Sequence, residues 1–534
     1  MDFSEKNEDR FFSGLNGSGQ FNDGDLGRRI LRERKTTRWN WSASMFYNNS
    51  IKNHNFDVLA GLETRSESID FSLARGDDFE NFATPQPIEL AGEQDFQSDR
   101  LENTGRSFFT QINYDFNKTY FLLINGRIDQ SSAFGDDRDT ALNAGIGGSW
   151  NISSEKFFNS NVIDFLRLRI SYGTTGNSRI GSYRALGLYT VDDVGQDGYN
   201  NNDYANLSSL PNPNLGWESN NKFNFGADVN VLNKYRLTVD FFRDNRKELI
   251  TSRPVISEVG LNQVQINGAS MFNQGLEVSM DAKWFDATDF SWSTNFNIST
   301  LTNEITELQG LGSQFSSAEN ARSRQVGFAQ STIWGFNFIG IDPATGRELY
   351  NVDGEIFDGS YVRQNFDQSD WVPIGDSQPD VYGGLRNSMR YKNFNLSIIM
   401  SYAIGQDFLV GREVLDNYRV LVNRNLNANI WAQAWQQPGD LAQYPIISNT
   451  NPIISNSTKY IFDESHIRLS TVNLSYNVPL KDSKILKSLS FFINGSNLMY
   501  WFFNPEDDYG NGVAEFRSVY PEMRTFTMGI NTSF

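Results

Sequence analysis

The sequence predicts an all-β chain folded as an antiparallel transmembrane β-barrel, and three features support that prediction. Apolar and polar residues alternate with period 2 along nearly the whole chain, in segments of about ten residues. Aromatic residues make up 14% of the chain and gather at the ends of these segments, as the aromatic girdles of membrane barrels do. Short and long connections alternate between the segments, which is typical of bacterial outer-membrane barrels.

The clearest alternation runs through two consecutive segments near the middle of the chain. We expect one face of these strands to contact lipid and the other face to line the lumen. The expected lipid-facing residues are Phe223, Phe225, Val229, Leu237 and Val239, and the expected lumen-facing residues are Asn224, Asp228, Arg236 and Asp240. Similar alternation predicts strands at 39–47, 56–64, 108–116, 120–128, 142–150, 166–172, 276–284, 290–298, 394–402, 489–493 and 526–534.

The connections between these strands predict which ends lie on which side of the membrane. We expect the short polar turns at Asn117, Asn233 and Lys392 to be periplasmic, and the long loops to be extracellular. A further strand at 347–352 keeps the order of short and long connections regular. The expected long loops are 65–104, 174–220, 243–271, 301–330, 353–378, 404–465 and 499–520.

The strand count predicts an incomplete barrel. The segments amount to roughly seventeen strands, whereas an antiparallel barrel closed by one chain normally has an even number. Residues 1–38 are poorly patterned and are expected to be an extracellular segment or a partial strand, and residues 39–534 the C-terminal part of the barrel. The opening MDFSEKNEDRFF lacks the features of a signal peptide, so the chain either starts in the cytoplasm or lacks its true beginning.

Composition argues against several other classes of protein. The 534 residues contain no run of about 18 apolar residues, which excludes transmembrane helices. A net charge of −18 without a basic stripe argues against nucleic acid as a partner. With no cysteine and two histidines, the chain cannot form disulfides or a multi-histidine zinc centre, and we expect neither enzyme activity nor a cofactor. A soluble β-sandwich or β-helix is the alternative, although soluble strands run nearer about 5 to 6 residues.

Seven segments, in this order, resemble the barrel of SusC-like (RagA-type) TonB-dependent transporters, which import oligosaccharides and peptides across the outer membrane of Gram-negative bacteria. The segments are NYDFNKTYFLLINGRIDQSSAFG, LRLRISYGTTGNSRIGSY, PNPNLGWESNNKFNFGADV, NGASMFNQGLEVSM, HIRLSTVNLSYNVP, INGSNLMYW and YPEMRTFTMGINTSF. The resemblance starts at Tyr114, with a looser match back to about Trp39, and it includes the aromatic C-terminal residue Phe534.

The resemblance implies more than this chain contains. Plugged outer-membrane transporters have about 22 strands, so about five strands and the plug are absent here and would come from a missing segment or another chain. The resemblance also implies a SusD-like surface lipoprotein that lids the extracellular loops. It further implies contact with TonB through an N-terminal portion that is not in this chain, outer-membrane lipid around the wall, and a periplasmic C-terminus.

Charged residues on the expected lumen face are candidates for holding a solute. They could bind the solute directly, or they could pair with lumen carboxylates or with a plug. We favour pairing, because opposite charges in a channel usually neutralise each other. The candidates are Arg127, Arg167, Arg169, Arg236 and Asp240.

Aromatic residues in the expected loops are a second group of candidates for solute binding, because sugar rings and peptide side chains stack on aromatic faces. The alternative is that these rings form small local cores within the loops. The candidates are Tyr199, Tyr204, Tyr361, Trp371, Trp431, Trp435 and Trp501.

Two acidic clusters could bind Ca²⁺, although neither has the full EF-hand spacing and solvated loop carboxylates explain them more simply. The clusters are Asp136, Asp137 and Asp139, and Glu506, Asp507 and Asp508. The leading functional hypothesis is an energised importer. A passive porin-like or structural barrel is the alternative, and a soluble β-rich binding module or glycan-acting enzyme is a third class. Neutral oligosaccharides and peptides remain equally open as solutes, and the net charge of −18 disfavours polyanionic glycans.

Overall fold

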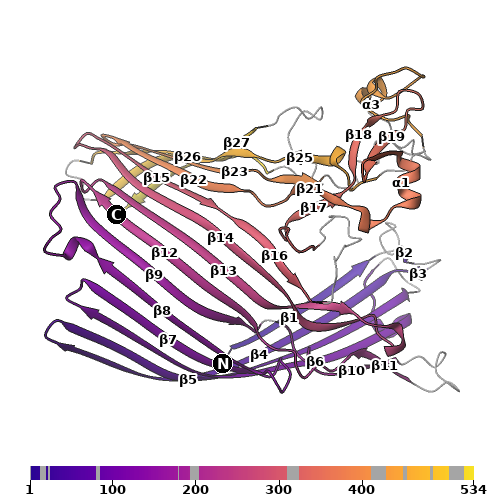
Figure 1. The fold of residues 1–534 in the computed structure, drawn as a ribbon, viewed down its shortest axis with the longest axis horizontal. Helices are drawn as coiled ribbons and strands as arrows, with labels where there is room; N and C mark the ends of the chain where they lie inside the picture. The colour runs from indigo at the N-terminus through magenta and orange to yellow at the C-terminus, as the bar shows by residue number, and fades with distance from the viewer. Residues whose placement is uncertain are drawn as a thin grey trace. The chain divides into compact units, whose positions relative to one another are not determined.

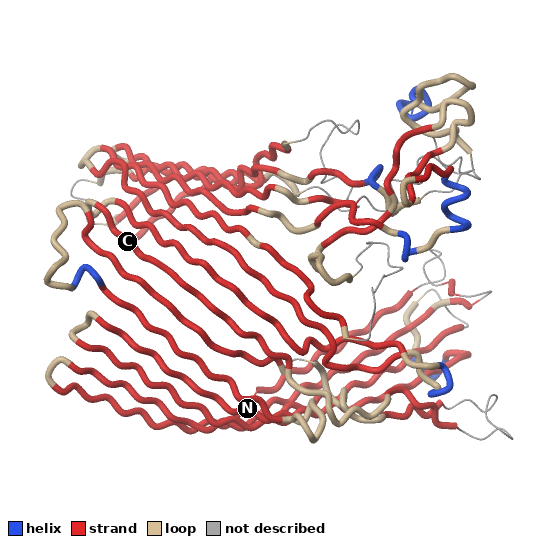
Figure 2. Tube along the Cα trace, in the orientation of Figure 1, coloured by secondary structure: helices blue, strands red, loops and turns tan. Residues whose placement is uncertain are grey.

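The structure is a computed structural model in which antiparallel β-strands dominate, which confirms the predicted all-β class (Figure 1 and Figure 2). None of the described helices is long and apolar enough to cross a membrane. Two compact units make up the chain: Met1–Gly148, Tyr172–Asn221 and Lys247–Gly268 form the first, and Ser149–Ser171, Lys222–Arg246 and Ala269–Phe534 form the second. The described residues are 2–12, 20–21, 25–79, 84–178, 180–192, 204–309, 324–409, 428–448, 454–480, 485–503 and 522–534.

Long antiparallel strands dominate the first unit. β4 (Arg28–Ile51), β5 (His54–Phe79) and β6 (Ala91–Phe116) have 24, 26 and 26 residues, and they pair along almost their whole length. β1 (Asp2–Phe12) pairs with the first part of β4, and β7 (Tyr120–Ser131) pairs with the last part of β6. A tilted membrane crossing needs about 9 to 11 residues, so β4, β5 and β6 are about twice as long as a crossing requires.

The outer parts of these strands were not predicted. The strand expected from residue 39 begins at Arg28, β1 lies within 1–38, and β5 and β6 fill most of the expected loop 65–104. These parts pair charged side chains across neighbouring strands, as in the 2.7 Å ion pair between Arg38 and Glu67. Residues 91–104 of β6 are mostly polar, so alternating hydrophobicity does not mark them, whereas Ile69, Phe71 and Leu73 alternate on β5 and do indicate a strand.

The second unit contains another run of antiparallel strands. β14 (Gln263–Asp286) pairs with β15 (Phe290–Thr300) and, nearer its start, with β16 (Thr302–Leu308). β15 pairs onward with β22, and β22, β23, β26, β27 and β28 then pair in that order. These five strands are Val381–Tyr391, Phe394–Ile404, His466–Asn477, Ser488–Phe502 and Thr525–Ser533.

Eight other strands complete the two units. β9, β12 and β13 each contribute residues to both units, and β10 and β11 form a separate two-stranded sheet. The eight are β2 (Gln20–Phe21), β3 (Asp25–Leu26), β8 (Thr140–Asn151), β9 (Ile163–Asn177), β10 (Leu188–Asp192), β11 (Tyr204–Ser209), β12 (Glu218–Val231) and β13 (Tyr235–Pro254).

The expected short turns are tight hairpin turns. Asn117, Asn233 and Lys392 have φ values of 54°, 52° and 50°. Positive φ is what two-residue hairpin turns need, because their backbone then matches the right-handed twist of the flanking strands. The predicted turns are therefore confirmed, whereas their periplasmic location stays a prediction.

Connections of the second unit lie side by side along one edge. Lys392 N–H donates a hydrogen bond to Asp289 O at 2.7 Å, which joins the β22–β23 turn to the β14–β15 turn. Lys487 N–H donates to Ser533 O at 2.8 Å, and Ser488 pairs with Ser533 at the end of β28. The last strand therefore ends beside the start of β27.

A small folded insertion, here called the loop module, lies between β16 and β22, with contributions from residues 407–409, 428–448 and 454–463. It contains a three-stranded sheet, two two-stranded sheets and short helices, and Figure 1 shows it at one end of the long strands of its unit. Its core is Phe336, Tyr350, Val352, Val362 and Ile454. Its elements are β17 (Thr332–Gly335), β18 (Asn337–Ile341), β19 (Glu348–Val352), β20 (Glu355–Asp358), α1 (Gly359–Asn365), β21 (Val372–Asp376), β24 (Asp407–Leu409), α3 (Ala428–Gln433) and β25 (Ile461–Asp463).

The strand expected at 347–352 is β19 of the loop module and not a strand of the wall. It has five residues, too few to cross a membrane, and Tyr350 at its centre is fully buried. The prediction that this strand keeps the order of wall strands regular is therefore wrong. A short strand with a buried aromatic residue cannot be told from a wall strand by periodicity alone.

Large apolar side chains remain exposed in rows along the long strands. Leu142 and Ile146 on β8 are 70% and 53% exposed, and Met528 on β28 is 79% exposed. In water such rows would be unfavourable, since continuous apolar surface drives association. A row of this kind is what a lipid-facing surface presents.

Candidate functional site

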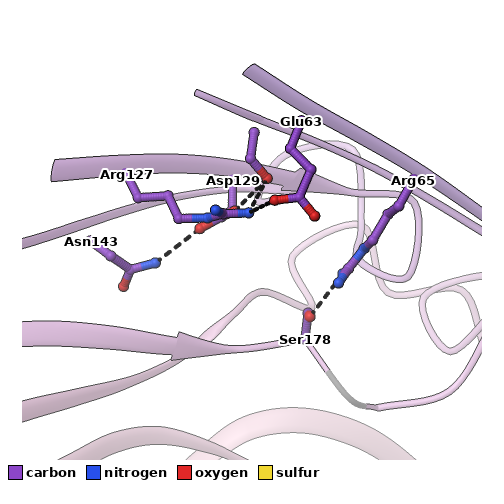
Figure 3. Close-up of polar contacts among 7 residues, drawn as sticks. Glu63, Arg65, Arg127, Asp129, Asn143 and Ser178 are labelled. Atoms are coloured by element: carbon purple, nitrogen blue, oxygen red, sulfur yellow. Dashed lines mark hydrogen bonds and ion pairs between the residues drawn. The ribbon is translucent and has the colours of Figure 1, made fainter. Parts of the chain in front are cut away.

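The first candidate region is a charge network on β5, β6, β7 and β8 of the first unit (Figure 3). Arg127 Nε contacts Asp129 Oδ1 at 2.6 Å, and its Nη2 contacts Glu63 Oε2 at 3.1 Å. The Ser107 hydroxyl accepts from Arg127 Nη2 at 2.7 Å and donates to Asp129 Oδ1 at 2.6 Å. Asn143 Nδ2 donates to Asp129 Oδ2 at 3.4 Å. Two carboxylates therefore share one guanidinium.

The strand registers place this network on one face of the sheet. Ser107 lies opposite both Glu63 and Asp129, and positions 127 and 129 share a face because side chains alternate along β7. The Arg127 guanidinium lies 5.5 Å from the centroid of the Phe109 ring. A Cβ at Gly61 would come within 2.4 Å of that ring, so the glycine lets the ring lie against β5 and support the guanidinium.

A second network lies on β9, β12 and β13 within the second unit. Arg169 Nε contacts Asp228 Oδ2 at 2.9 Å, and Arg169 Nη2 contacts Asp240 Oδ2 at 3.0 Å. Arg167 Nη2 reaches Asp228 Oδ2 at 2.8 Å. A Cβ at Gly226 would come within 2.7 Å of the Arg169 guanidinium, so this position needs a glycine for the network to fit. Two arginines and two aspartates neutralise each other here.

These networks agree with the interpretation that the charges pair. All four of Arg127, Arg167, Arg169 and Asp240 have ion-pair partners within the networks. Sequence reasoning did not identify Glu63 as a partner, since it is 64 positions from Arg127 and only the strand register brings the two together. That these side chains face a lumen stays a prediction.

Arg236 differs from the other candidate charges. Within the described part of the chain it has no ion pair, and its side chain is exposed. It lines a polar pocket of about 480 Å³ together with Lys234, Lys283, Asp281 and Asn295. The short turn at Asn233 also lines this pocket, which places it at the turn edge of the second unit.

Among the candidate aromatic residues, two lie within the packing of the loop module. Trp435 is 9% exposed, and its Nε1 donates to Pro343 O at 2.9 Å. Its ring covers Gly346, where a Cβ would lie 2.5 Å from the indole. Trp371 packs against the module core. For these residues the structure shows the local cores that were the alternative to solute binding.

The other aromatic candidates have different environments. Tyr361 on α1 stacks on Phe357 with 4.9 Å between ring centroids and stays 47% exposed, and Trp431 on α3 is 56% exposed. Trp501 lies in β27, so the prediction that it stands in a loop is wrong; the strand runs on to Phe502 because its residues continue to pair with β26. Tyr204 begins β11. Tyr199 lies outside the described residues, and a binding role for any of these rings stays a prediction.

The acidic clusters give no sign of a metal site in the described ranges. No three His, Cys, Asp or Glu side chains come together there as metal ligands. Asp139 Oδ2 accepts a hydrogen bond from Gln130 at 2.6 Å, and Asp139 Oδ1 accepts one from Thr140 at 2.7 Å. Glu506, Asp507 and Asp508 lie outside the described residues, so Ca²⁺ binding by that cluster stays untested.

The structure also contains a cleft that sequence reasoning missed. It has a volume of about 610 Å³ and lies within the second unit. Its lining comes from five short stretches, within 242–246, 271–273, 301–303, 324–331 and 377–378. Because these stretches are dispersed over more than a hundred residues, no local motif in the sequence could have indicated the cleft.

Long antiparallel strands with one row of exposed apolar side chains and an opposite face of paired charges define a membrane β-barrel wall. The chain belongs to the family described as "TonB dependent receptor-like, beta-barrel", whose model matches residues 2–498. This confirms the resemblance to SusC-like TonB-dependent transporters. The family consists of outer-membrane receptors and transporters and not of enzymes.

Curated relatives are similar to this chain in sequence, and a solved structure is similar to it in fold. The chain is 26% identical over 579 residues to TonB-dependent receptor P26 of Formosa agariphila, with 100% of this chain and 57% of the relative covered. It is 24% identical over 546 residues to TonB-dependent receptor SusC of Bacteroides thetaiotaomicron, with 93% and 50% covered. A structure of the RagAB peptide transporter matches with a TM-score of 0.84 at 23% identity, with 100% and 59% covered. The chain thus spans a little over half the length of these relatives.

Proposed function

We propose that this chain forms the wall and the extracellular loops of an energised outer-membrane importer. The observation that supports this most strongly is the family match over residues 2–498. In this proposal a plug and a TonB-contacting portion, from a segment outside this chain or from another chain, complete the transporter. The solute is an oligosaccharide or a peptide, captured with the help of a SusD-like surface lipoprotein.

The charge networks support a role in guiding a polar solute past a plug. Asp228 and Asp240 have side chains that are 14% and 18% exposed and share the guanidinium of Arg169. A wall with matched charges neither traps ions nor leaves a carboxylate uncompensated in a low-dielectric setting. Its surface offers hydrogen-bonding groups without a strong net field, which suits polar contact with a plug and with a passing solute.

The loop module supports the proposed contact with a lipoprotein partner. Ile356, Tyr361 and Val372 are 62%, 47% and 42% exposed on a part of the chain that has its own buried core. Exposed aromatic and branched apolar side chains on a rigid element are typical of protein interfaces. We assign the lipoprotein contact to this face of the module.

Uptake measurements separate an energised importer from a passive pore. In a strain whose growth on a given oligosaccharide or peptide requires this chain, a protonophore should stop uptake of that solute within minutes. TonB draws on the proton-motive force, whereas diffusion through a pore does not need it. Uptake that continues unchanged in the presence of the protonophore would favour the passive porin-like barrel.

The proposed topology has a direct test in intact cells. An epitope tag beside Leu441, which is 94% exposed in the loop module, should bind antibody on whole cells. A tag in the turn at Asn233 or after Phe534 should bind antibody only after the outer membrane is permeabilised. The reverse pattern would place the turns and the C-terminus outside the cell.

A further inference from the structure

The cleft of about 610 Å³ lies on the same face of β13 as the Arg169 network. Arg246 is an even number of residues from Asp240, so the two side chains leave the strand on one face. Leu301 and Asn303 line the cleft from the start of β16. Gln330 and Gln378 line it from the two segments that connect to the loop module. The cleft is therefore built where the wall meets the module, wholly within the second unit.

The cleft contains two arginines that have no carboxylate partner within the described ranges. Arg246 and Arg324 are both exposed and take part in no ion pair there. This contrasts with the two-carboxylate environments of Arg127 and Arg169. One carboxylate, Asp244, also lines the cleft, so the local formal charge is still positive.

Neutral hydrogen-bonding groups, together with the apolar side chains of Phe242, Met271 and Leu301, complete the lining. Ser331 Oγ is buried and has no hydrogen-bond partner among the described atoms. Asn303 is held in place, because its Oδ1 accepts from Gln330 N–H at 2.8 Å and its Nδ2 donates to Asn273. Ser377 Oγ donates to Ser331 O at 3.1 Å, which fixes the two connecting segments against each other. The lining is thus positioned by the protein while the guanidinium groups remain available.

We propose that this cleft binds the carboxylate of the transported solute. Planar guanidinium groups bind carboxylates through paired N–H···O bonds, and the surrounding amides and hydroxyls suit the hydroxyl or amide groups beside such a carboxylate. Both a uronic-acid oligosaccharide and a peptide present this chemistry. The cleft volume falls within the usual range for small-molecule sites, about 300 to 1,000 Å³. The proposal rests on the importer function and specifies an acidic group on the solute.

Binding to the purified full-length transporter tests this directly. The probes are trigalacturonic acid with its methyl ester, and trialanine with its C-terminal amide, each measured by calorimetry. The wild-type protein should prefer the acidic member of at least one pair. Arg246→Gln and Arg324→Gln should each reduce that preference about tenfold, since each removes one charge-assisted contact. The neutral member of the pair should bind the variants and the wild type alike.

Arg386→Gln is the matched control. Arg386 lies on β22 in the same unit, is also exposed and without an ion pair in the described ranges, and is not part of the cleft. Its loss should leave the acidic preference unchanged. An equal loss in Arg386→Gln would overturn the proposal, as would a wild-type protein that binds acidic and neutral probes equally or binds no acidic probe. Uptake that stops with a protonophore in the same strain would show that the importer function stands even if this site does not.

Discussion

The wall strands and the loop module have the same antiparallel backbone structure but bury opposite kinds of surface. On the wall, Leu142 and Met528 are 70% and 79% exposed, whereas in the module Trp334 and Tyr350 are 1% and 0% exposed. The module follows the rule for proteins in water, in which large apolar side chains pack inside. The wall directs such side chains outward, as a protein surrounded by lipid does. The difference shows that the surface of the module suits water and the surface of the wall suits lipid.

Ion pairs on the wall and in the loop module also differ in how deeply they are buried. Arg169 on the wall retains 30% of its side-chain exposure although it contacts two aspartates. In the module, the ion pair of Lys459 with Glu348 is 9% and 7% exposed, and the Tyr350 hydroxyl donates to Glu348 Oε2 at 2.6 Å. Burial raises the pKa of the Tyr350 hydroxyl, so this group stays a hydrogen-bond donor at any physiological pH. The ion pair of the module is therefore more buried than the pairs of Arg169 on the wall.

The largest expected effect comes from breaking the buried pair in the module. Lys459→Met removes the cation and leaves the Glu348 carboxylate buried with only the hydrogen bond from the Tyr350 hydroxyl. Such a change usually costs about 3 to 5 kcal/mol. Because the module has its own core, we expect the module to become sensitive to protease while the wall keeps its heat-dependent gel mobility. The measurement is limited proteolysis of the intact transporter followed by electrophoresis with and without heating.

A double variant tests whether the unpaired charge of Glu348 causes the expected protease sensitivity. Lys459→Met combined with Glu348→Gln removes both charges but keeps an oxygen that can accept from the Tyr350 hydroxyl. It should recover most of the lost protease resistance, because neutral partners of similar shape carry a smaller desolvation cost. If the double variant is as sensitive as the single one, packing of the Lys459 side chain and not its charge is what matters.

The stability cost of adding a charge to the wall should depend on whether the added side chain is on the face predicted to contact lipid or on the polar face. Leu237 on β13 is 37% exposed and is predicted to contact lipid, and Leu237→Arg should destabilise the barrel by about 2 to 4 kcal/mol if it lies near the bilayer midplane. Asn224→Arg, on the face predicted to be polar, should cost much less. Unfolding in urea from lipid vesicles measures both. Equal costs would contradict the assignment of faces.

Cysteine labelling sharpens the same comparison without adding a charge. Since the chain has no cysteine of its own, Leu237→Cys and Asn224→Cys each introduce one defined reactive position. A lipid-soluble maleimide should react faster with the first and a water-soluble one with the second.

The parts of the fold that could be predicted are those in which one face is apolar. The strands around Phe223 and Leu237 alternate strictly, and the structure has β12 and β13 there. Residues 91–104 of β6 are mostly polar and give no period-2 signal, whereas Ile69, Phe71 and Leu73 give one on the outer half of β5 that the expected loop 65–104 overlooks. Residues 347–352 have strand-forming composition, yet periodicity does not tell which sheet a strand joins, and they belong to the loop module.

The sites were less predictable because they depend on register. That Arg127 would be paired was inferred from the general neutrality of channels, but its partner Glu63 is known only once β5, β6 and β7 are aligned. The sequence makes Trp435 a candidate for binding, but in the fold its ring covers Gly346 and its Nε1 is bonded to Pro343 O. The cleft containing Arg246 and Arg324 had no signal in the sequence at all, since neither arginine lies in a recognisable motif.

The smallest expected effect on stability comes from a group of neighbouring carboxylates around β24 and β25 of the loop module. Asp407 on β24 lies opposite Asp463 on β25, and its Oδ2 accepts from Asp376 N–H at 2.9 Å. Burial raises the pKa of the Asp407 carboxyl above its ordinary value of 3.8, the Asp376 N–H bond lowers it, and the neighbouring charges of Asp463, Asp376 and Asp380 raise it further. The ionised form of Asp407 is thus disfavoured in the folded module.

The sign of the pH dependence follows from the raised pKa of Asp407. Above that pKa the folded module holds an unfavourable charge, and the penalty disappears as the pH falls through the raised pKa toward 3.8. Asp407→Asn should therefore stabilise the module at pH 7, because an amide oxygen can still accept from Asp376 N–H without carrying a charge. This advantage should shrink as the pH falls through the acidic range.

Asp342→Asn is the opposite control. Bonds from the Thr345 hydroxyl and the Ala344 N–H lower the pKa of Asp342, so its carboxylate is favoured in the fold and its loss should weaken the module at pH 7. Protease resistance of the module measured from pH 7 to pH 4 tests both, and a destabilised Asp407→Asn at pH 7 would show that its charge supports the fold.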